Sequence, residues 1–340
     1  MRNKNIVTKN VIYGITGLTL LILAISLGTQ TPSSAQSSSI MDEQNSTIAS
    51  RENSTIYHGE DYVKLLAQSM ENRLEKDAAV LEITSMLPEV KDVSYAHMLN
   101  NTIEQLKGIP QNADILKRQI AKDILQKFGD FQVVFFIMPN GDIYFIEPYT
   151  QQENLSKTNF AFRDYYKGAI TNNDTFLGNV IVSAASGQSQ AVMAVPIHSG
   201  ANGSLTGIWA GGLDMSQFNE SLQLLNLSNN ERVVYVDNLG QVVADSDKQS
   251  LSQNESFANL QGFKNAINGK SGTIKETVNG TETLVSYYPV KAPSNKWAVL
   301  LIQPNNVNPA ASSSSNYAIA NNSIIENNKQ KEMPLQNTSK

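Results

Sequence analysis

The chain has 340 residues, a net charge of −5 and no cysteine. The acidic balance argues against nucleic-acid binding, which needs a basic face to offset phosphate charge. The absence of cysteine excludes disulfides and thiolate metal sites. The three histidines, His58, His97 and His198, are scattered without metal-ligand spacing, so no zinc site is expected.

An uncharged apolar run, Val11–Gly28, dominates the N-terminal region. As a helix it would be about 27 Å long, close to the ~30 Å hydrocarbon core of a bilayer. Basic residues precede it and none follows before Arg51, so the positive-inside rule places residues 1–10 in the cytoplasm and the bulk of the chain outside. We favour an uncleaved single-pass anchor in the cell membrane. The alternative is a signal peptide cleaved after the small residues Ser33–Ala35, which would give a secreted protein.

Residues 29–56 are polar, Ser-rich and free of aromatics, which predicts a flexible stalk. Twelve Asn-x-Ser/Thr sequons follow the apolar run, as expected of a glycoprotein on the outer side. Asn- and Ser-rich loops also generate such sequons passively, so both interpretations stay open. The sequons lie at Asn45, Asn53, Asn100, Asn154, Asn173, Asn202, Asn219, Asn226, Asn254, Asn279, Asn321 and Asn337.

A helical pattern starts near Glu60 and ends at Pro88. A second helix is expected over Ala113–Phe128. The β-branched and aromatic runs Phe131–Met138 and Ile143–Ile146 predict two strands, because turn residues separate them. The apolar stripe of the first helix consists of Val63, Leu66, Met70, Leu74, Ala78 and Leu81.

The stretch Phe160–Asp214 carries an Arg-x-Tyr-Tyr cluster that opens a short helix. Two strands joined at a Gly-containing turn follow, and then a third strand, Leu205–Leu213, which ends on an aspartate. Three glycines in Gly207–Gly212 indicate close approach of a neighbouring backbone or a ligand. Asp214 stands at the N-cap position of a connecting helix, Met215–Leu225.

A smaller unit repeats this design, with the dipeptide Asn279-Gly280 as a strong hairpin signal. Two sheets of hairpin-connected strands, with helices on one face, form an α+β pattern. Residues 305–340 are polar and predict a disordered tail. The elements expected in the smaller unit are strands Arg232–Val236, Gln241–Ala244, Gly272–Val278, Thr283–Val290 and Trp297–Gln303, and helix Phe257–Asn268.

The stretch Phe160–Asp214 resembles the ligand-binding half of a double Cache (dCache) domain, the PAS-like extracellular sensor of chemoreceptors and sensor histidine kinases. The resemblance covers roughly residues 60–303. It implies an α+β fold of two tandem PAS-like modules with antiparallel sheets on a long N-terminal helix. Residues 57–227 would form that helix and the membrane-distal module, and residues 228–304 the membrane-proximal one. With no output domain expected in this chain, signalling would need a homodimer or a separate receptor.

The resemblance also implies a site for an amino acid or another small carboxylate. Arg163 would bind the ligand carboxylate, Tyr165 and Tyr166 would wall the pocket, and Asp214 would hold an ammonium group. The chemistry is reasonable, because guanidinium presents a planar fork that suits a carboxylate. No cofactor and no metal is implied.

Three positions depart from the amino-acid motif of the family: Thr158, Ile181 and Ser183 stand where that motif has Tyr, Tyr and Asp. The departures leave room for other carboxylates or an uncharged ligand. The proposed residues also have simpler roles: Asp214 as a helix cap only, Arg163 in a surface ion pair with Asp164 or Asp174, and one of the two tyrosines outside the pocket.

Three functions remain after these observations. The first is an extracytoplasmic small-molecule sensor, the second a solute-capturing protein for a transporter, and the third a structural or adhesive surface glycoprotein without a ligand. An enzyme is not expected, because the chain has no nucleophile elbow, phosphate-binding loop or zinc-protease motif.

Overall fold

A computed structural model describes residues 36–99, 107–199, 203–228, 230–247 and 255–305, and the side chains from His58 onward. The expected membrane anchor, residues 11–28, and the expected tail beyond residue 305 lie outside these ranges. None of the helices within them combines the length and the apolar composition that a bilayer crossing requires.

Helix α1 (Gln36–Ser85) is the longest element of the fold. The expectation of a flexible stalk was wrong for residues 36–56, which are helical. This segment contains neither proline nor glycine, and a helix that is already nucleated extends at low cost one residue at a time. Five residues of the expected apolar stripe are buried, and the sixth, Leu66, is partly buried against the same core. Ala67 joins the buried face, which consists of Val63, Ala67, Met70, Leu74, Ala78 and Leu81.

The first sheet is antiparallel, with the strand order β2-β1-β7-β6-β3. Its strands are β1 (Phe131–Ile137), β2 (Ile143–Glu147), β3 (Phe176–Leu177), β6 (Val192–Ser199) and β7 (Ser204–Leu213). A separate two-stranded sheet joins β4 (Ile181–Val182) and β5 (Ser189–Gln190). The helical segments of this region are α2 (Pro88–Lys91), η1 (Ser94–Met98), α4 (Ile115–Lys127), α5 (Tyr149–Glu153), α6 (Asp164–Asn172) and α7 (Met215–Gln223).

The second sheet has the order β10-β11-β12-β8-β9 and is also antiparallel. Asn279 and Gly280 form the predicted turn, with φ of 49° and 81°. Two five-stranded sheets in tandem, together with the N-terminal helix, confirm the α+β fold of two PAS-like modules. The elements here are β8 (Arg232–Val236), β9 (Val242–Asp245), α8 (Gln261–Ile267), β10 (Gly272–Val278), β11 (Thr281–Ala292) and β12 (Asn295–Pro304).

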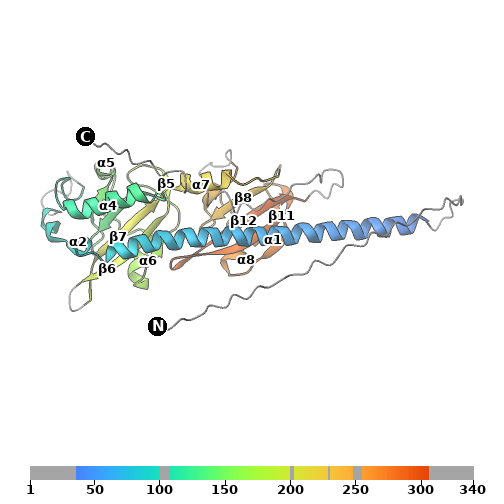
Figure 1. Cartoon of the computed structure of the whole chain (residues 1–340), viewed down its shortest axis with the longest axis horizontal. Coiled ribbons are helices and arrows are strands. Elements are labelled where there is room, and N and C mark those ends of the chain that lie inside the picture. Colours follow the sequence, from blue (N-terminus) through green and yellow to red (C-terminus); the bar gives the residue numbers. More distant parts are fainter. Residues whose placement is uncertain (1–35, 100–106, 200–202, 229, 248–254, 306–340) are drawn as a thin grey trace, which may run out of the picture. The chain divides into compact units, whose positions relative to one another are not determined.

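One hydrophobic core is shared by both sheets. It joins the buried stripe of α1 to Trp209 and Phe145 of the first sheet and to Tyr235 and Trp297 of the second. Figure 1 labels the strands of the two sheets, among them β6 and β7 of the first and β11 and β12 of the second. The opposite faces carry separate cores, one under α6 and one under α8. The expectation that helices cover one face was therefore wrong: each sheet packs against helical elements on both faces, because its strands are apolar on both.

The segment Leu177–Val180 links the two modules through its backbone. The amide of Leu177 donates to the carbonyl of Pro293 at 2.9 Å, and Asn295 Nδ2 donates to the Leu177 carbonyl at 2.7 Å. Three residues on, the Val180 amide donates to Oδ2 of the buried Asp237 at 2.8 Å. The first and second modules are thus hydrogen-bonded directly to one another.

The glycines of β7 are explained by close packing of its neighbours. A Cβ on Gly207 would lie 2.3 Å from Phe136 Cε1 and 2.6 Å from the carbonyl oxygen of Ile137. Because backbone cannot yield as a side chain does, we expect Gly207→Ala to destabilise the fold by about 1–3 kcal/mol, measured as a lower urea midpoint. Gly129→Ala is the matched control, since its Cβ would meet nothing within 4 Å. Equal midpoints for the two variants would contradict this account.

Candidate ligand-binding site

Arg163 lies immediately before α6 and is half-buried. Its Nη2 donates to the carbonyl of Val182 at 3.0 Å, and its guanidinium stacks 4.9 Å from the ring of Phe162. Its Nε is buried and has no hydrogen-bond partner. The expected alternative, an ion pair with Asp164 or Asp174, is not found among the ion pairs of the described residues.

Tyr165 and Tyr166 are both buried, in the core between α6 and the first sheet. The ring of Tyr165 meets that of Phe135 edge-on at 6.2 Å, and burial, the largest effect, raises the pKa of its hydroxyl well above its ordinary value. The Tyr166 hydroxyl donates to the carbonyl of Pro139 at 2.6 Å. The Tyr166 hydroxyl is therefore already used within the fold.

Asp214 caps α7, as its position predicted. Its Oδ1 accepts from the amide of Ser216 at 2.9 Å and from the hydroxyl of the same residue at 2.6 Å. Side chains alternate along β7, and Ile208 and Ala210 belong to the core under α6. The same alternation carries Asp214 to the end of that face. No contact joins Asp214 to Arg163 among the described residues, so the structure shows a cap and leaves ligation as a proposal.

The three residues that depart from the amino-acid motif make contacts within the fold. The Thr158 carbonyl accepts from the Ile143 amide at 2.9 Å. Ile181 packs against the core under α6. The buried Ser183 hydroxyl accepts from the amides of Ala185 and Ser186, at 3.3 and 3.2 Å. None of these three provides an acidic group for an ammonium ion.

Two glutamines that the sequence analysis did not single out lie near the Asp214 end of the same face. Gln132 Nε2 donates to Oε1 of the buried Gln190 at 3.2 Å and to the carbonyl of Leu213 at 3.3 Å. A Cβ on Gly212 would come within 2.9 Å of Gln190 Oε1. The sequence signal for this pair was Gln190, a polar residue directly before the apolar run that forms β6.

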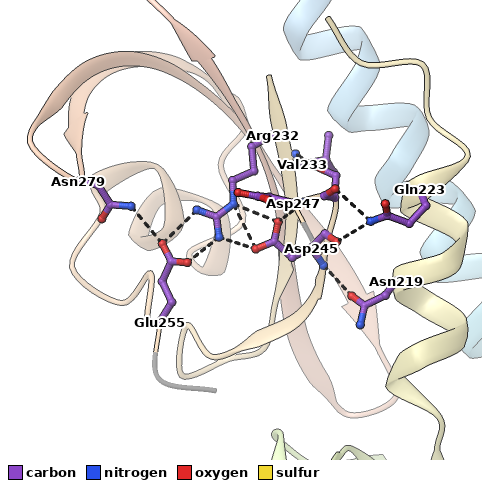
Figure 2. A network of polar contacts seen from close by, with 9 residues as sticks. Asn219, Gln223, Arg232, Val233, Asp245, Asp247, Glu255 and Asn279 are labelled. Atoms are coloured by element: carbon purple, nitrogen blue, oxygen red, sulfur yellow. Dashed lines mark hydrogen bonds and ion pairs between the residues drawn. The ribbon is translucent and has the colours of Figure 1, made fainter. Parts of the chain in front are cut away.

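A second polar cluster lies between α7 and the second sheet (Figure 2). Arg232 Nε donates to both carboxylate oxygens of Asp245, at 3.0 and 3.1 Å, and its Nη1 and Nη2 reach Glu255 at 3.1 and 2.6 Å. Helix α7 joins through Asn219, whose Oδ1 accepts from the Asp245 amide at 2.9 Å. All three nitrogens of this guanidinium are hydrogen-bonded within the protein, so none is left to bind a ligand. The bond from Asn219 to β9 links α7 to the second sheet.

Two tandem PAS-like modules on one long helix, with an arginine and tyrosines at the start of α6, define a sensor fold of the Cache type. The chain belongs to the Cache domain family, whose model matches residues 33–310. No curated protein sequence matched.

Solved structures share this fold at low sequence identity. The ligand-binding domain of the Pseudomonas fluorescens chemoreceptor CtaA, in complex with L-isoleucine, is 15% identical with a TM-score of 0.50, over 80% of this chain and 96% of that one. The sensory domain of the Campylobacter jejuni chemoreceptor Tlp3 (CcmL), with isoleucine bound, is 15% identical with a TM-score of 0.53, over 76% and 96%. The Tlp3 ligand-binding domain in complex with L-valine is 15% identical with a TM-score of 0.52, over 76% of this chain and 96% of that one.

Proposed function

We propose that this chain is an extracytoplasmic sensor whose first module binds a small molecule carrying a carboxylate. Arg163 binds the carboxylate, Tyr165 lines the pocket with Tyr166 behind it, and Asp214 holds a cationic group where the ligand has one. The ligand is bound and released without chemical change.

The unpaired donor of Arg163 supports this proposal most directly. A buried donor without an acceptor costs about 1–3 kcal/mol, and Nε of Arg163 is in that position. Nη2 is held only by the neutral carbonyl of Val182. A carboxylate offers two charged oxygens to the same edge of the guanidinium, so it would satisfy the free Nε and replace a weaker bond with a stronger one.

The ligand class follows from the rest of the site. The CtaA and Tlp3 structures contain isoleucine or valine, which makes an amino acid the first class to test. The motif positions at Ile181 and Ser183 carry no acidic group, so an ammonium group would depend on Asp214. We therefore propose that recognition of the carboxylate dominates, and that small carboxylates without an amine also bind.

The test is a thermal-shift screen against amino acids, amines, small carboxylates and purines. A ligand at a hundred times its Kd adds about 2.7 kcal/mol of stability, or roughly 4–5 °C in Tm for a chain of this size. We expect Arg163→Ala to weaken binding of any hit by about 2–5 kcal/mol in calorimetry. Lys157→Ala is the control, because it removes a cation that also lies against Phe162, at 5.0 Å.

Two outcomes would contradict the proposal at different levels. If Arg163→Ala binds a hit as tightly as the unmodified chain does, the site is wrong although the sensor function stands. If a folded sample binds nothing in the library, the structural or adhesive surface protein becomes the better interpretation, since Ser183 and Ile181 already have structural roles.

We also propose that residues 11–28 anchor the chain in the cell membrane and that α1 pairs with a second copy or a separate receptor. Leu65 and Ile83 support the pairing, because both lie on α1 with 63% and 66% of their surface exposed. Light scattering of the detergent-solubilised chain tests this. A strict monomer that also fails to crosslink in membranes would argue against it.

A further inference from the structure

Asp77 is a carboxylate buried within the apolar stripe of α1. It lies three residues after Leu74 and four before Leu81, and its exposed fraction is 0%. Both carboxyl oxygens are buried and have no hydrogen-bond partner. A charged carboxylate in that position is costly, because nothing replaces the hydrogen bonds it made to water.

The cations nearby are committed to another carboxylate, that of Asp130 at the residue before β1. Lys76 Nζ lies 2.7 Å from Asp130 Oδ2 but 3.6 Å from Asp77 Oδ1. Arg73 Nε donates to Asp130 Oδ1 at 3.0 Å. Asp77 therefore faces a second acid whose charge is already neutralised by two bases.

Arg73 also connects this acid pair to α7. Its guanidinium lies 3.9 Å from the centre of the Phe218 ring, and its Nη1 donates to Ser221 Oγ at 3.1 Å. The charged groups acting on Asp77 are Asp130 from the segment before β1, and Arg73 and Lys76 from α1 itself. From α7, the contacts to Arg73 are made by an aromatic ring, a hydroxyl and the Gln217 carbonyl.

A proton on Asp77 resolves the missing hydrogen bond, since it turns the carboxyl into a donor facing Asp130. Burial, and then the charge of Asp130, raise the pKa of Asp77 to about 7, against the lowering effect of Lys76 and Arg73. For Asp130, burial is the largest single effect and raises the pKa, but the hydrogen bonds and charges of Arg73 and Lys76 together lower it below its ordinary value. The two acids are thus pushed apart, one protonated and one ionised.

We propose that Asp77 is a proton-binding site that makes the contact of α1 with α7 and the start of β1 responsive to pH near neutrality. In the protonated form Asp77 donates to Asp130, and Arg73 stays on α7. In the ionised form Asp77 competes for Lys76 and Arg73, which loosens the contact to α7. The side chains of this site are not those proposed to bind a carboxylate ligand.

The direction of the effect on stability follows from proton binding in the two states. Unfolded, Asp77 has a pKa of about 3.9, so between about pH 4 and about pH 7 only the folded chain holds the proton. The contribution of Asp77 to stability therefore falls as pH rises through this window, and above about pH 7 its full penalty remains. The pKa of Asp130 is lowered in the folded chain, so its contribution to stability is lost as pH falls, at pH values below this window.

The test compares urea unfolding of the whole chain with that of Asp77→Asn, at about pH 5.5 and about pH 8. Asparagine imitates the neutral acid but does not titrate. From about pH 5.5 to about pH 8, we expect ionisation of Asp77 to raise the unfolding equilibrium constant of the unmodified chain by about 30-fold. Asp77→Asn should lack this contribution. Asp61→Asn, at an exposed position of the same helix, should behave as the unmodified chain does.

Parallel pH profiles for Asp77→Asn and the unmodified chain would overturn the proposal. If Asp77→Asn does not fold, the test is an NMR titration of the unmodified chain that follows the chemical shift of the Asp77 carboxyl carbon with pH. A midpoint near pH 7 supports the site and one near pH 4 removes it. Hydrogen exchange gives a second readout. After correction for the intrinsic pH dependence of exchange, the exchange rates of α7 should rise with the ionised fraction of Asp77. Unchanged rates would mean that the protonation of Asp77 does not affect the contact of α1 with α7.

Discussion

Replacing Arg118 with alanine is expected to lower the free energy of unfolding by about 3–5 kcal/mol, because it leaves a buried carboxylate without its partner. Arg118 Nη1 lies 2.8 Å from Glu147 Oε1, and the two side chains are only 1% and 2% exposed. Water cannot reach Glu147 to replace the lost cation.

The same guanidinium also binds the backbone around it. It donates to the carbonyls of Ala113 at 3.1 Å, Ile109 at 3.0 Å and Pro110 at 3.2 Å. These residues belong to the segment that leads into α4, which the Ile109 amide also joins to β2 through the Tyr144 carbonyl at 2.8 Å. We therefore expect the loss of Arg118 to loosen this segment as well as to leave Glu147 unpaired.

Chemical denaturation measures the effect, with Lys122→Ala as the control for an exposed cation on the same helix. The double variant Arg118→Met, Glu147→Leu separates the two contributions. It removes the unpaired charge, so it should be more stable than Arg118→Met alone, since apolar replacement of both partners of a buried pair is often tolerated. A double variant no more stable than the single one would place the whole effect in the backbone contacts.

Replacing Arg232 with alanine is expected to destabilise the second module by a similar amount, about 3–5 kcal/mol. Asp245 is fully buried and depends on Arg232, while Glu255 is only partly exposed to water. Hydrogen bonds from Arg232 are the largest cause of the lowered pKa of Glu255. Without the guanidinium, two carboxylates would face one another across the edge of the sheet in Figure 2.

Hydrogen exchange shows where this destabilisation acts. Asn219 of α7 accepts from the Asp245 amide of β9, and Gln223 donates to the Asp245 carbonyl. Exchange should therefore rise in α7 and β9 before it rises in β1. Lys296→Ala, an exposed cation on β12, should leave both the stability and the pattern unchanged. Exchange that rises uniformly along the chain would show that Arg232 does not act locally.

Much of the fold could be predicted because its signals are local. Apolar runs marked most of the strands, Asn279-Gly280 marked a hairpin, and the aspartate at 214 marked a helix start. Asp77 also left a local signal that the sequence analysis did not use, since it occupies a position of the apolar stripe of α1 where a charge is costly.

The buried ion pairs could not be predicted, because their partners are far apart in the sequence. Arg118 and Glu147 are both common surface residues, and only the packing of α4 on β2 brings them together. The same holds for the site: the identity of Arg163 was visible, but its bond to Val182 and its unsatisfied Nε depend on where the short strand β4 comes to lie.

The hydrophobic core shared by both sheets has a consequence for how the molecule can be divided. Cutting after α7 would separate the N-terminal part of the α1 stripe, near Leu66, from the second sheet and expose Tyr235 and Trp297 to water. It would also break the backbone bonds that Leu177 and Val180 make across the boundary. Two modules that look like separate repeats in sequence thus share one core, and neither can be removed without uncovering apolar surface of the other.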